Sequence, residues 1–448
     1  MKVKGFRVQH PKLGQGEVID IRHRGYECLV KFNTGLTLWV KRRHLTFLDE
    51  TLKLSPFQNK EPLLVFPSTF KPSLKGGREV IEAFRAGIVP ENWVKGWTVG
   101  RATELSQVKT WLHDQTSGTL VIKGEYGAGK THLIEYLYHQ ALELKYAAAR
   151  VSIEPWGTQL AFPKRIYRQL IQTLRVPYEG SNLNFREVIS LLSQKESFAD
   201  HAILHPFVIA LKNGQVTTAM WQWLEGFEST FREWGVLYDH TTAANIYCYI
   251  LSGLSNALVN CLDINGVLLL FDETETSRIY RYSYEWLRGI NFIRALVMVA
   301  NDEPVLVEEK IIRGEHYYQG ERTGLIYSGH RKWPYIYRLP TYLKVAFAVT
   351  PDFSLENMAS EYNIYTIELE PLPYHYLEHF FYRFVELYHK VYGLKLTSRE
   401  KRKIFTFIKN YASISTRLFI KAMVECLDFK RFYPTATLKK LSSGGRTK

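Results

Sequence analysis

Buried strands alternate with amphipathic helices along most of this chain. Four hydrophobic runs of strand length lie at residues 119–123, 267–271, 344–350 and 364–369, and a further strand is expected at 150–154. Such runs are typical of strands buried on both faces of a parallel sheet. Apolar residues recur at helical spacing between them, as at Leu133, Ile134, Leu137 and Ala141. The pattern predicts an α/β fold with a parallel sheet within residues 76–370.

The first seventy-five residues carry a different pattern. Three short runs at 18–21, 27–32 and 36–40 are rich in β-branched and aromatic residues, with turn signals at 14–16, 24–25 and 33–35. This predicts a small all-β barrel over residues 1–50. Residues 51–75 contain four prolines and predict a linker ending at Gly76-Gly77, with a helix starting near Glu79.

Three helices are expected after residue 371. The first covers about 374–392, the second opens with a capping box at Thr397 and Glu400, and the third covers about 414–428. Arg417 falls in the first turn of the third helix. We therefore expect a helical lid over residues 371–428, followed by a basic tail over 429–448.

Composition narrows the class of protein. The chain has 448 residues, of which 46% are hydrophobic and 23% charged, and this excludes a disordered chain. No run of eighteen apolar residues occurs and the start is polar, which predicts neither a membrane span nor a signal peptide. The chain has four cysteines, which lie far apart: Cys28, Cys248, Cys261 and Cys426. This spacing argues against a zinc site or a disulfide framework, and favours a location in the reducing cytoplasm.

The net charge of +14 is concentrated at the two ends. Residues 1–48 carry +7 and residues 429–448 carry +6, which leaves +1 for the rest of the chain. Such ends favour contact with an anionic partner, double-stranded DNA above all. A solvated basic surface is the alternative.

A phosphate-binding motif follows the first predicted strand. Residues 124–131 read G-E-Y-G-A-G-K-T and lead into a predicted helix, which is the context of a P-loop. Backbone N–H groups of such a loop surround phosphates, its lysine reaches the β- and γ-phosphates, and its hydroxyl ligates Mg²⁺. The motif predicts ATP and Mg²⁺ as cofactors, held by Gly124, Tyr126, Gly127, Ala128, Gly129, Lys130, Thr131 and His132.

Two carboxylates end the third predicted strand. Asp272 and Glu273 follow the run 267–271, as in a Walker B strand. Asp272 would hold the Mg²⁺ shell together with Thr131, and Glu273 would polarise the attacking water. An apolar run followed by two acids is common, so the interpretation depends on the P-loop. Together they predict an ATPase that yields ADP and phosphate.

These motifs resemble the AAA+/STAND group of P-loop ATPases. Val99, Gly100 and Arg101, with Glu104 and Leu105, match the V-G-R-x-x-E-L element that walls the adenine there. The resemblance implies two further catalytic residues. Thr350 would be the sensor 1 residue, unless it is a plain turn threonine. Arg417 would be the sensor 2 arginine of the lid, unless it is a solvated helix residue.

A closer resemblance rests on residues 80–90, the V-G-R element and the P-loop. Together they are similar to the P-loop family that includes the BREX phage-defence ATPase BrxD. This implies a helical insertion at about 155–262 and a role in antiviral defence with protein partners. The resemblance covers most of residues 78–428. Separately, residues 10–18 resemble the Tudor/SH3-like module of CarD-type regulators and UvrD-type helicases, which docks onto a protein or nucleic acid.

Residues 311–340 interleave cations with aromatic rings. This favours a loop that tracks DNA phosphates and stacks on bases, or equally a subunit interface; a packed hairpin is the alternative. Arg331 and Arg338 are candidate arginine fingers, which would require a homo-oligomer. The segment contains Arg313, Arg322, Arg331, Lys332 and Arg338, with Tyr317, Tyr318, Tyr327, Trp333, Tyr335 and Tyr337.

Two functions remain open from the sequence. The first is an ATPase that remodels a complex on or near DNA in a BREX-like defence system. The second is a slowly hydrolysing ATP switch or scaffold that recruits partners through its barrel. An origin-type DNA loader is disfavoured, because only about twenty residues follow the lid and a winged-helix domain needs more. Protease, esterase and metal-hydrolase motifs are absent, and His139, His240 and His389 are expected to be structural.

Overall fold

The computed structural model describes most of the chain. The described residues are 7–22, 27–41, 45–48, 73–228, 230–231, 235–278, 283–353, 355, 362–411 and 415–438. The predicted linker, up to residue 72, and the end of the predicted basic tail lie outside them. The chain divides into two compact units, one of residues 1–58, 108–122 and 137–367, the other of 59–107, 123–136 and 368–448. The domain limits given above stay a prediction.

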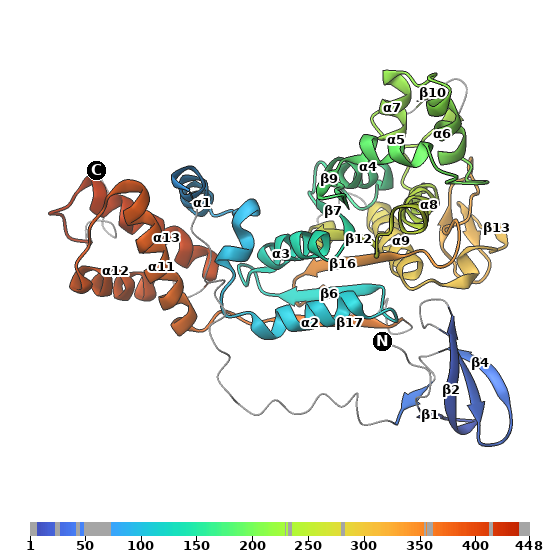
Figure 1. Cartoon of the computed structure of the whole chain (residues 1–448), viewed down its shortest axis with the longest axis horizontal. Helices are drawn as coiled ribbons and strands as arrows, with labels where there is room; N and C mark the ends of the chain where they lie inside the picture. The colour runs from blue at the N-terminus through green and yellow to red at the C-terminus, as the bar shows by residue number, and fades with distance from the viewer. Residues whose placement is uncertain are drawn as a thin grey trace. The chain divides into compact units, whose positions relative to one another are not determined.

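The N-terminal segment forms a five-stranded antiparallel sheet, in the order β4-β3-β2-β1-β5 (Figure 1). Its strands are β1 (Arg7–His10), β2 (Gly14–Arg22), β3 (Glu27–Phe32), β4 (Thr37–Lys41) and β5 (Thr46–Phe47). Alternate residues such as Val18, Val30 and Phe32 make a small core of their own. The predicted β unit is confirmed, but residues 14–16 belong to β2 and are not a turn. Gly16 is needed there, because an added Cβ would lie 2.7 Å from Val30 Cγ1.

The larger sheet contains the five predicted buried strands, in the order β17-β6-β16-β12-β7. They are β6 (Thr119–Gly124), β7 (Tyr146–Ser152), β12 (Gly266–Asp272), β16 (Leu343–Val349) and β17 (Ile364–Leu369). β12 pairs in parallel with β7 and β16. The predicted α/β fold is confirmed. β7 begins four residues earlier than expected, because the small residues Ala147–Ala149 pair with β12 although alanine has little strand propensity.

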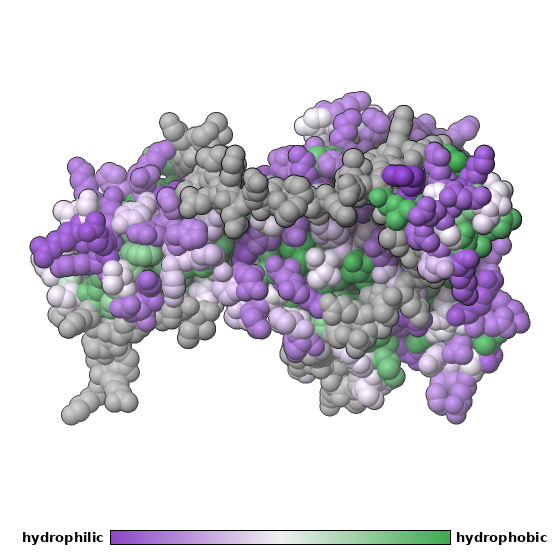
Figure 2. All heavy atoms as spheres, turned by 90° about the horizontal axis from the view of Figure 1, so that it is seen from below, coloured by the Kyte–Doolittle hydropathy of each residue, from purple (hydrophilic) through white to green (hydrophobic). Residues whose placement is uncertain are grey.

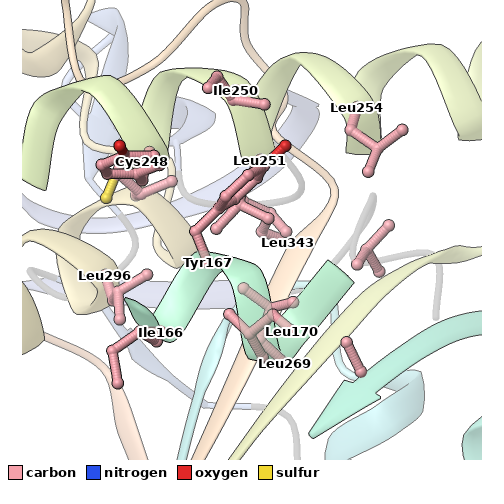
Figure 3. Packing of buried hydrophobic residues seen from close by; sticks show 14 of the residues in the cluster. Ile166, Tyr167, Leu170, Cys248, Ile250, Leu251, Leu254, Leu269, Leu296 and Leu343 are labelled. Atoms are coloured by element: carbon pink, nitrogen blue, oxygen red, sulfur yellow. The ribbon is translucent and has the colours of Figure 1, made fainter. Parts of the chain in front are cut away.

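Helices pack on this sheet and make the main core. α4 (Pro163–Thr173) packs on β7, α8 (Ala244–Leu262) on β12, and α9 (Ser283–Ala300) on β16. Leu170, Leu251 and Leu269 meet in this core (Figure 3). Close packing of these helices against the strands holds the strands in place. The polar residues at the strand ends are positioned in the same way.

The region between β7 and β12 is mainly helical, as the resemblance implied. Besides α4 and α8 it holds α5 (Phe185–Ser193), α6 (Leu204–Lys212) and α7 (Thr218–Leu224). Two small antiparallel pairs lie among them, β8 (Val176–Tyr178) with β9 (Ser181–Leu183), and β10 (Thr230–Phe231) with β11 (Gly235–Val236).

The segment 311–340 folds onto its own unit. β13 (Ile311–Arg313), β14 (Tyr318–Gly320) and β15 (Ile326–Tyr327) form a three-stranded antiparallel sheet. Tyr327 and Tyr335 are fully buried in the main core, so the expectation that these two rings stack on bases is wrong. They meet edge to face, and such packing excludes them from solvent.

The second unit is helical. It contains α1 (Leu74–Ala86), the 3₁₀ segment η4 (Glu91–Trp97), the start of α2 (Ala102–His113), and α11 (Tyr374–Tyr392), α12 (Ser398–Tyr411) and α13 (Thr416–Phe432). The first lid helix and the capping box of the second are confirmed. The third extends four residues beyond the predicted end.

α1 begins at Leu74, not near Glu79, because the Ser73 side chain caps it. Gly76 and Gly77 lie inside the helix, although glycine ordinarily weakens one. Their missing side chains permit close packing: an added Cβ at Gly76 would collide with Trp93, and one at Gly77 would lie 2.7 Å from Val391. The two glycines therefore serve helix packing and do not end a linker.

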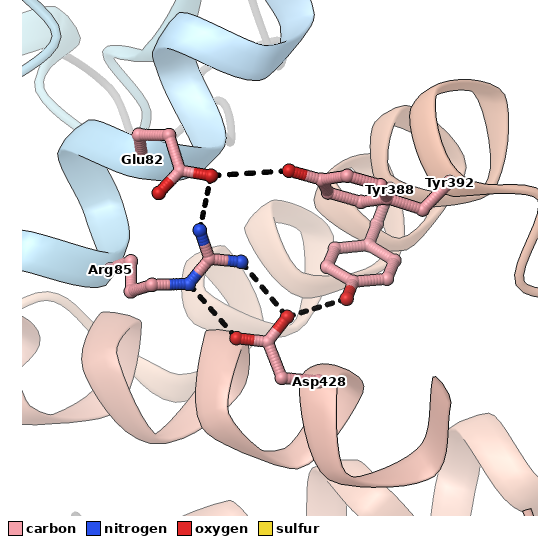
Figure 4. A network of polar contacts seen from close by, with 5 residues as sticks. All are labelled: Glu82, Arg85, Tyr388, Tyr392 and Asp428. Carbon is pink, nitrogen blue, oxygen red and sulfur yellow. Dashed lines mark hydrogen bonds and ion pairs between the residues drawn. The ribbon is translucent and has the colours of Figure 1, made fainter. Parts of the chain in front are cut away.

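A polar network joins α1 to the lid helices (Figure 4). Arg85 donates from Nε and Nη2 to the two oxygens of Asp428, both at 2.9 Å, and also pairs with Glu82. The hydroxyl of Tyr388 donates to Asp428 and that of Tyr392 to Glu82. The hydrogen bonds that Arg85 donates to Asp428 and Glu82 raise its pKa above its usual value. Bidentate pairing of this kind has a defined geometry, so α1 is held in register with α13.

None of the helices in the described part of the chain is both long and apolar enough to cross a membrane.

Candidate nucleotide-binding site

The P-loop has the context predicted for it. β6 ends at Gly124 and α3 (Lys130–Glu143) begins at Lys130. Gly127 and Gly129 adopt φ values of +82° and +104°, which other residues rarely adopt. Lys130 is 8% exposed, and its ammonium donates to the carbonyl of Gly124 at 2.8 Å. The loop is thus closed on itself at the amino end of a helix, where anions bind.

Arg101 holds this loop from outside. Its guanidinium donates to Glu104 Oε1, to the carbonyl of Ala128 and to the carbonyl of Glu370, each at 2.7 Å. It therefore links the V-G-R element, the P-loop and the start of the lid within the second unit. The prediction that Arg101 contacts nucleotide stays a prediction, since these three hydrogen bonds are to protein oxygens.

The other two residues of the V-G-R element are packed. Val99 is buried in the core of the second unit. Gly100 has a φ of +63°, and an added Cβ would lie 2.6 Å from the ring of Tyr376 in the first turn of α11. Glycine is therefore needed for both the backbone conformation and the close approach of a ring. No local pattern pointed to Tyr376, because it is 276 residues away in the chain.

Thr98 and His132 make a contact that the sequence did not predict. The Thr98 hydroxyl donates to the carbonyl of Val94 at 2.9 Å and lies 2.8 Å from His132 Nε2. Since the hydroxyl has one proton, Nε2 carries the hydrogen and donates it to Thr98. Burial, assisted by the charge of Arg101, lowers the pKa of His132 to about 4. His132 is therefore neutral near pH 7.

The lid arginine lies beside the P-loop. Arg417 Nη1 donates to the Tyr126 hydroxyl at 2.6 Å, and Tyr126 is 69% exposed. Ser415 caps α13, and an added Cβ at Gly127 would lie 2.8 Å from its Oγ. The structure thus brings Arg417 next to Tyr126 and Gly127, all in the second unit. Neither the cap at Ser415 nor its nearness to Gly127 was predicted from the sequence.

The predicted acids lie at the end of β12 in the first unit. Asp272 is 8% exposed, and its Oδ1 accepts the Glu273 N–H at 3.0 Å. Glu273 is exposed and has a φ of +52°, an unfavourable conformation for a residue with a Cβ. Neighbouring chain fixes it, because the Thr276 hydroxyl donates to the carbonyls of Glu273 and Ile153, both at 2.8 Å. Strain held in this way is typical of functional sites.

Thr350 follows β16, which lies between the P-loop strand β6 and the acid strand β12 in the sheet order. In open α/β sheets ligands bind at the carboxyl ends of the strands. This strand order fits the predicted sensor. The candidate finger Arg338 donates instead to Asp200 and to the carbonyl of Ala199 in its own unit.

Two of the predicted residues carry oxygen donors of the kind that Mg²⁺ prefers. Thr131 in the second unit has a hydroxyl, and Asp272 in the first unit has a carboxylate. Within the described ranges no three His, Cys, Asp or Glu side chains gather into a metal-binding group, and the four cysteines are free thiols.

One family model matches the chain. Residues 73–195 match the family described as BREX system ATP-binding protein BrxC/D. None of the curated proteins compared with the chain matches it. Among solved structures, AMPPCP-bound DnaA from Aquifex aeolicus is similar over 79% of this chain and 86% of that one, with 11% identity and a TM-score of 0.26. The stretch from α1 to α5, which contains the P-loop, is therefore similar to the BrxC/D family of BREX ATP-binding proteins.

Proposed function

We propose that the chain binds ATP with Mg²⁺ and hydrolyses it to ADP and phosphate, as the ATPase of a BREX-like antiviral defence system. One observation carries the proposal. A P-loop that joins a buried strand to a helix lies inside the segment that matches a family of BREX ATP-binding proteins.

Each side chain has a role in this proposal. Lys130 and the N–H groups at the start of α3 bind the phosphates, and Arg101 keeps the loop in the shape that receives them. Thr131 and Asp272 hold Mg²⁺, which neutralises charge on the phosphates. Glu273 accepts a proton from the attacking water. Thr350 and Arg417 contact the γ-phosphate.

Turnover of the purified full-length chain tests the proposal. Phosphate release is measured for the unmodified protein, for Lys130→Ala and for Glu273→Gln, with Lys145→Ala as control because Lys145 is an exposed lysine paired only with exposed Asp263. We expect both site variants to lose at least about 100-fold in turnover. Equal turnover in all four proteins would contradict the enzymatic proposal.

A slow switch is the second candidate. The N-terminal sheet has a hydrophobic core of its own, which suits a module that docks onto a partner. In this second proposal the sheet is a Tudor-like module that binds that partner. A switch needs no catalytic base. Tight ATP binding combined with turnover that Glu273→Gln leaves unchanged would favour the switch over the ATPase.

Action on or near DNA is proposed from the charge of residues 1–48 and 429–448. Affinity for duplex DNA should fall steeply with salt, and deletion of both ends should flatten that dependence. Unchanged affinity in the truncated protein would reject the ends as the contact. We also propose that the chain forms a homo-oligomer in which Arg331 or Arg338 acts as an arginine finger on a neighbouring copy. Location in the cytoplasm is a further proposal.

A further inference from the structure

A second surplus of positive charge lies inside the lid. Residues 371–428 contain ten Lys or Arg and five Asp or Glu, so the near-neutral balance of the long middle segment conceals an uneven distribution. Half of these cations belong to α12, whose sequence begins S-R-E-K-R-K. The lid surface is mainly hydrophilic (Figure 2).

The periodicity of α12 places its charges on one face. After the exposed first residue Ser398, the exposed residues are separated by three, one, three, three and one positions, which is the spacing of a single helix face: Arg399, Arg402, Lys403, Thr406, Lys409 and Asn410. The opposite face is buried in the core of the second unit through Ile404, Phe405 and Ile408. The helix is therefore held with four of its five cations, Arg399, Arg402, Lys403 and Lys409, toward solvent.

Acidic neighbours offset little of this charge, although Lys403 attracts the Glu400 carboxylate. In the described part of the chain, Arg399, Arg402 and Lys403 make no ion pair with an acidic side chain. Glu400 is the one acid of α12, and its carboxylate accepts from the Thr397 N–H and hydroxyl, both at 2.8 Å. Those bonds lower the pKa of Glu400 and keep the carboxylate at the start of the helix. Lys409 lies 4.6 Å above the ring of Tyr374, which leaves its charge intact.

We propose that the exposed face of α12 binds the phosphate backbone of double-stranded DNA. Arg399 and Lys409 are ten residues apart, about 15 Å along the helix axis. Duplex DNA carries one charge per roughly 1.7 Å of its own axis, so this line of cations can meet several phosphates at once. The proposal deepens the DNA part of the proposed function and is independent of ATP hydrolysis.

Two other partners fit the face less well. Protein interfaces have aromatic and apolar side chains at their centre, and the exposed face of α12 has none. A membrane-bound helix must insert its apolar side, but that side of α12 is already buried by α11 and α13. The Thr406 hydroxyl donates to the carbonyl of Arg402, so it is engaged within the helix. The proposed contact to the phosphate backbone depends on charge and not on base identity, and it predicts little sequence preference.

The test uses the full-length chain and a labelled duplex of about two helical turns. Dissociation constants are measured by fluorescence anisotropy over a series of salt concentrations. The face variant carries Arg399→Gln, Arg402→Gln, Lys403→Gln and Lys409→Gln, because glutamine keeps helix propensity. A control variant removes the same charge at scattered exposed positions, with Lys75→Gln, Lys109→Gln, Lys145→Gln and Lys212→Gln.

We expect the face variant to lose at least about tenfold in affinity at low salt, and its log–log salt slope to fall by about 2 to 4. The control variant should keep most of the affinity and the slope. Equal losses in the two variants, or a loss of binding to anionic vesicles with DNA binding unchanged, would overturn the proposal.

A charge-preserving variant sharpens the test. Arg399→Lys, Arg402→Lys, Lys403→Arg and Lys409→Arg should bind duplex DNA with nearly unchanged affinity, since phosphates respond to charge. Loss of binding in this variant would contradict a backbone contact. Turnover without DNA should be unchanged in every α12 variant, whereas Lys130→Ala should lose turnover and keep DNA binding. Failure of this inference is thereby distinguished from failure of the ATPase proposal.

Discussion

The two groups of candidate catalytic residues are built in different ways. In the second unit the cations Arg101, Lys130 and Arg417 donate hydrogen bonds to protein oxygens, among them the Gly124 carbonyl and the Tyr126 hydroxyl. In the first unit the acids end a strand buried along its whole length, and Glu273 is held in a left-handed conformation. The cationic side is therefore suited to binding phosphate, and the acidic side to the chemical step. Variants of the two sides should change different quantities.

The largest effect is expected on the cationic side. Lys130→Ala removes the ammonium that would contact the β- and γ-phosphates, so ATP affinity should fall by at least about tenfold and turnover by at least about 100-fold. Calorimetric titration with ATP and phosphate release measure the two quantities. Lys145→Ala should change neither. A Lys130→Ala protein that binds ATP normally would contradict the assignment of the cationic side to binding.

A variant of the acidic side should lose turnover and keep its affinity for ATP. Glu273→Gln removes a base while it keeps the size of the side chain, so turnover should fall by about 100-fold or more with ATP affinity nearly unchanged. The same titration and phosphate assay measure this. Glu315→Gln, at an exposed glutamate of the same unit, is the control. If Glu273→Gln weakened ATP binding as much as Lys130→Ala does, the two sides would not differ in the way proposed.

A smaller effect is expected at the contact between Arg417 and Tyr126. Arg417→Ala removes a charge proposed to reach the γ-phosphate and should reduce turnover by about tenfold. Tyr126→Phe removes one hydrogen bond that orients Arg417, so a change of only a few-fold is expected. A double-mutant cycle on turnover measures the coupling of the pair. Strictly additive effects would show that Tyr126 does not act through Arg417.

The smallest effect concerns stability against pH. Burial lowers the pKa of His132 to about 4, below the usual value of 6.5, so the unfolded chain binds the proton more tightly. His132 therefore opposes folding as pH falls from about 6.5 to about 4, by about 1–3 kcal/mol. Denaturant titrations of the unmodified protein and of His132→Gln measure the difference.

His201 has a pKa lowered to about 3 by burial and contributes to the same loss, so only part of the pH dependence should disappear in His132→Gln. An unchanged pH dependence in the His132→Gln protein would contradict the burial of His132.

The strands and the P-loop could be predicted because their signals are local. Strand β12 is a continuous apolar run ending in two acids, and the motif at 124–131 has fixed spacing. The segment 311–340 could not be predicted in the same way. Its alternation of cations and rings is the same whether the rings stack on bases or pack in a core, and only the fold buries Tyr327 and Tyr335.

Long-range contacts explain the rest of what the sequence missed. Arg101 donates to the carbonyls of two residues that lie 27 and 269 positions away in the chain. Arg417 and Tyr126, which bond to each other, are 291 positions apart. The residue pattern within one helix or strand carries no information about such distant pairs. The start of α1 was missed for a related reason, since Gly76 and Gly77 disfavour a helix locally and are compensated by packing on Trp93 and Val391.

The sequence by itself determined the parallel α/β core, the P-loop and the capped lid helices, because strand and helix periods and the backbone needs of glycine act over a few residues. The tertiary structure decided which charges are available. It engages Arg101 with protein oxygens and pairs the half-exposed Arg338 with Asp200. It also brings four cations of α12 onto one exposed face, because burial of Ile404, Phe405 and Ile408 fixes how that helix is rotated.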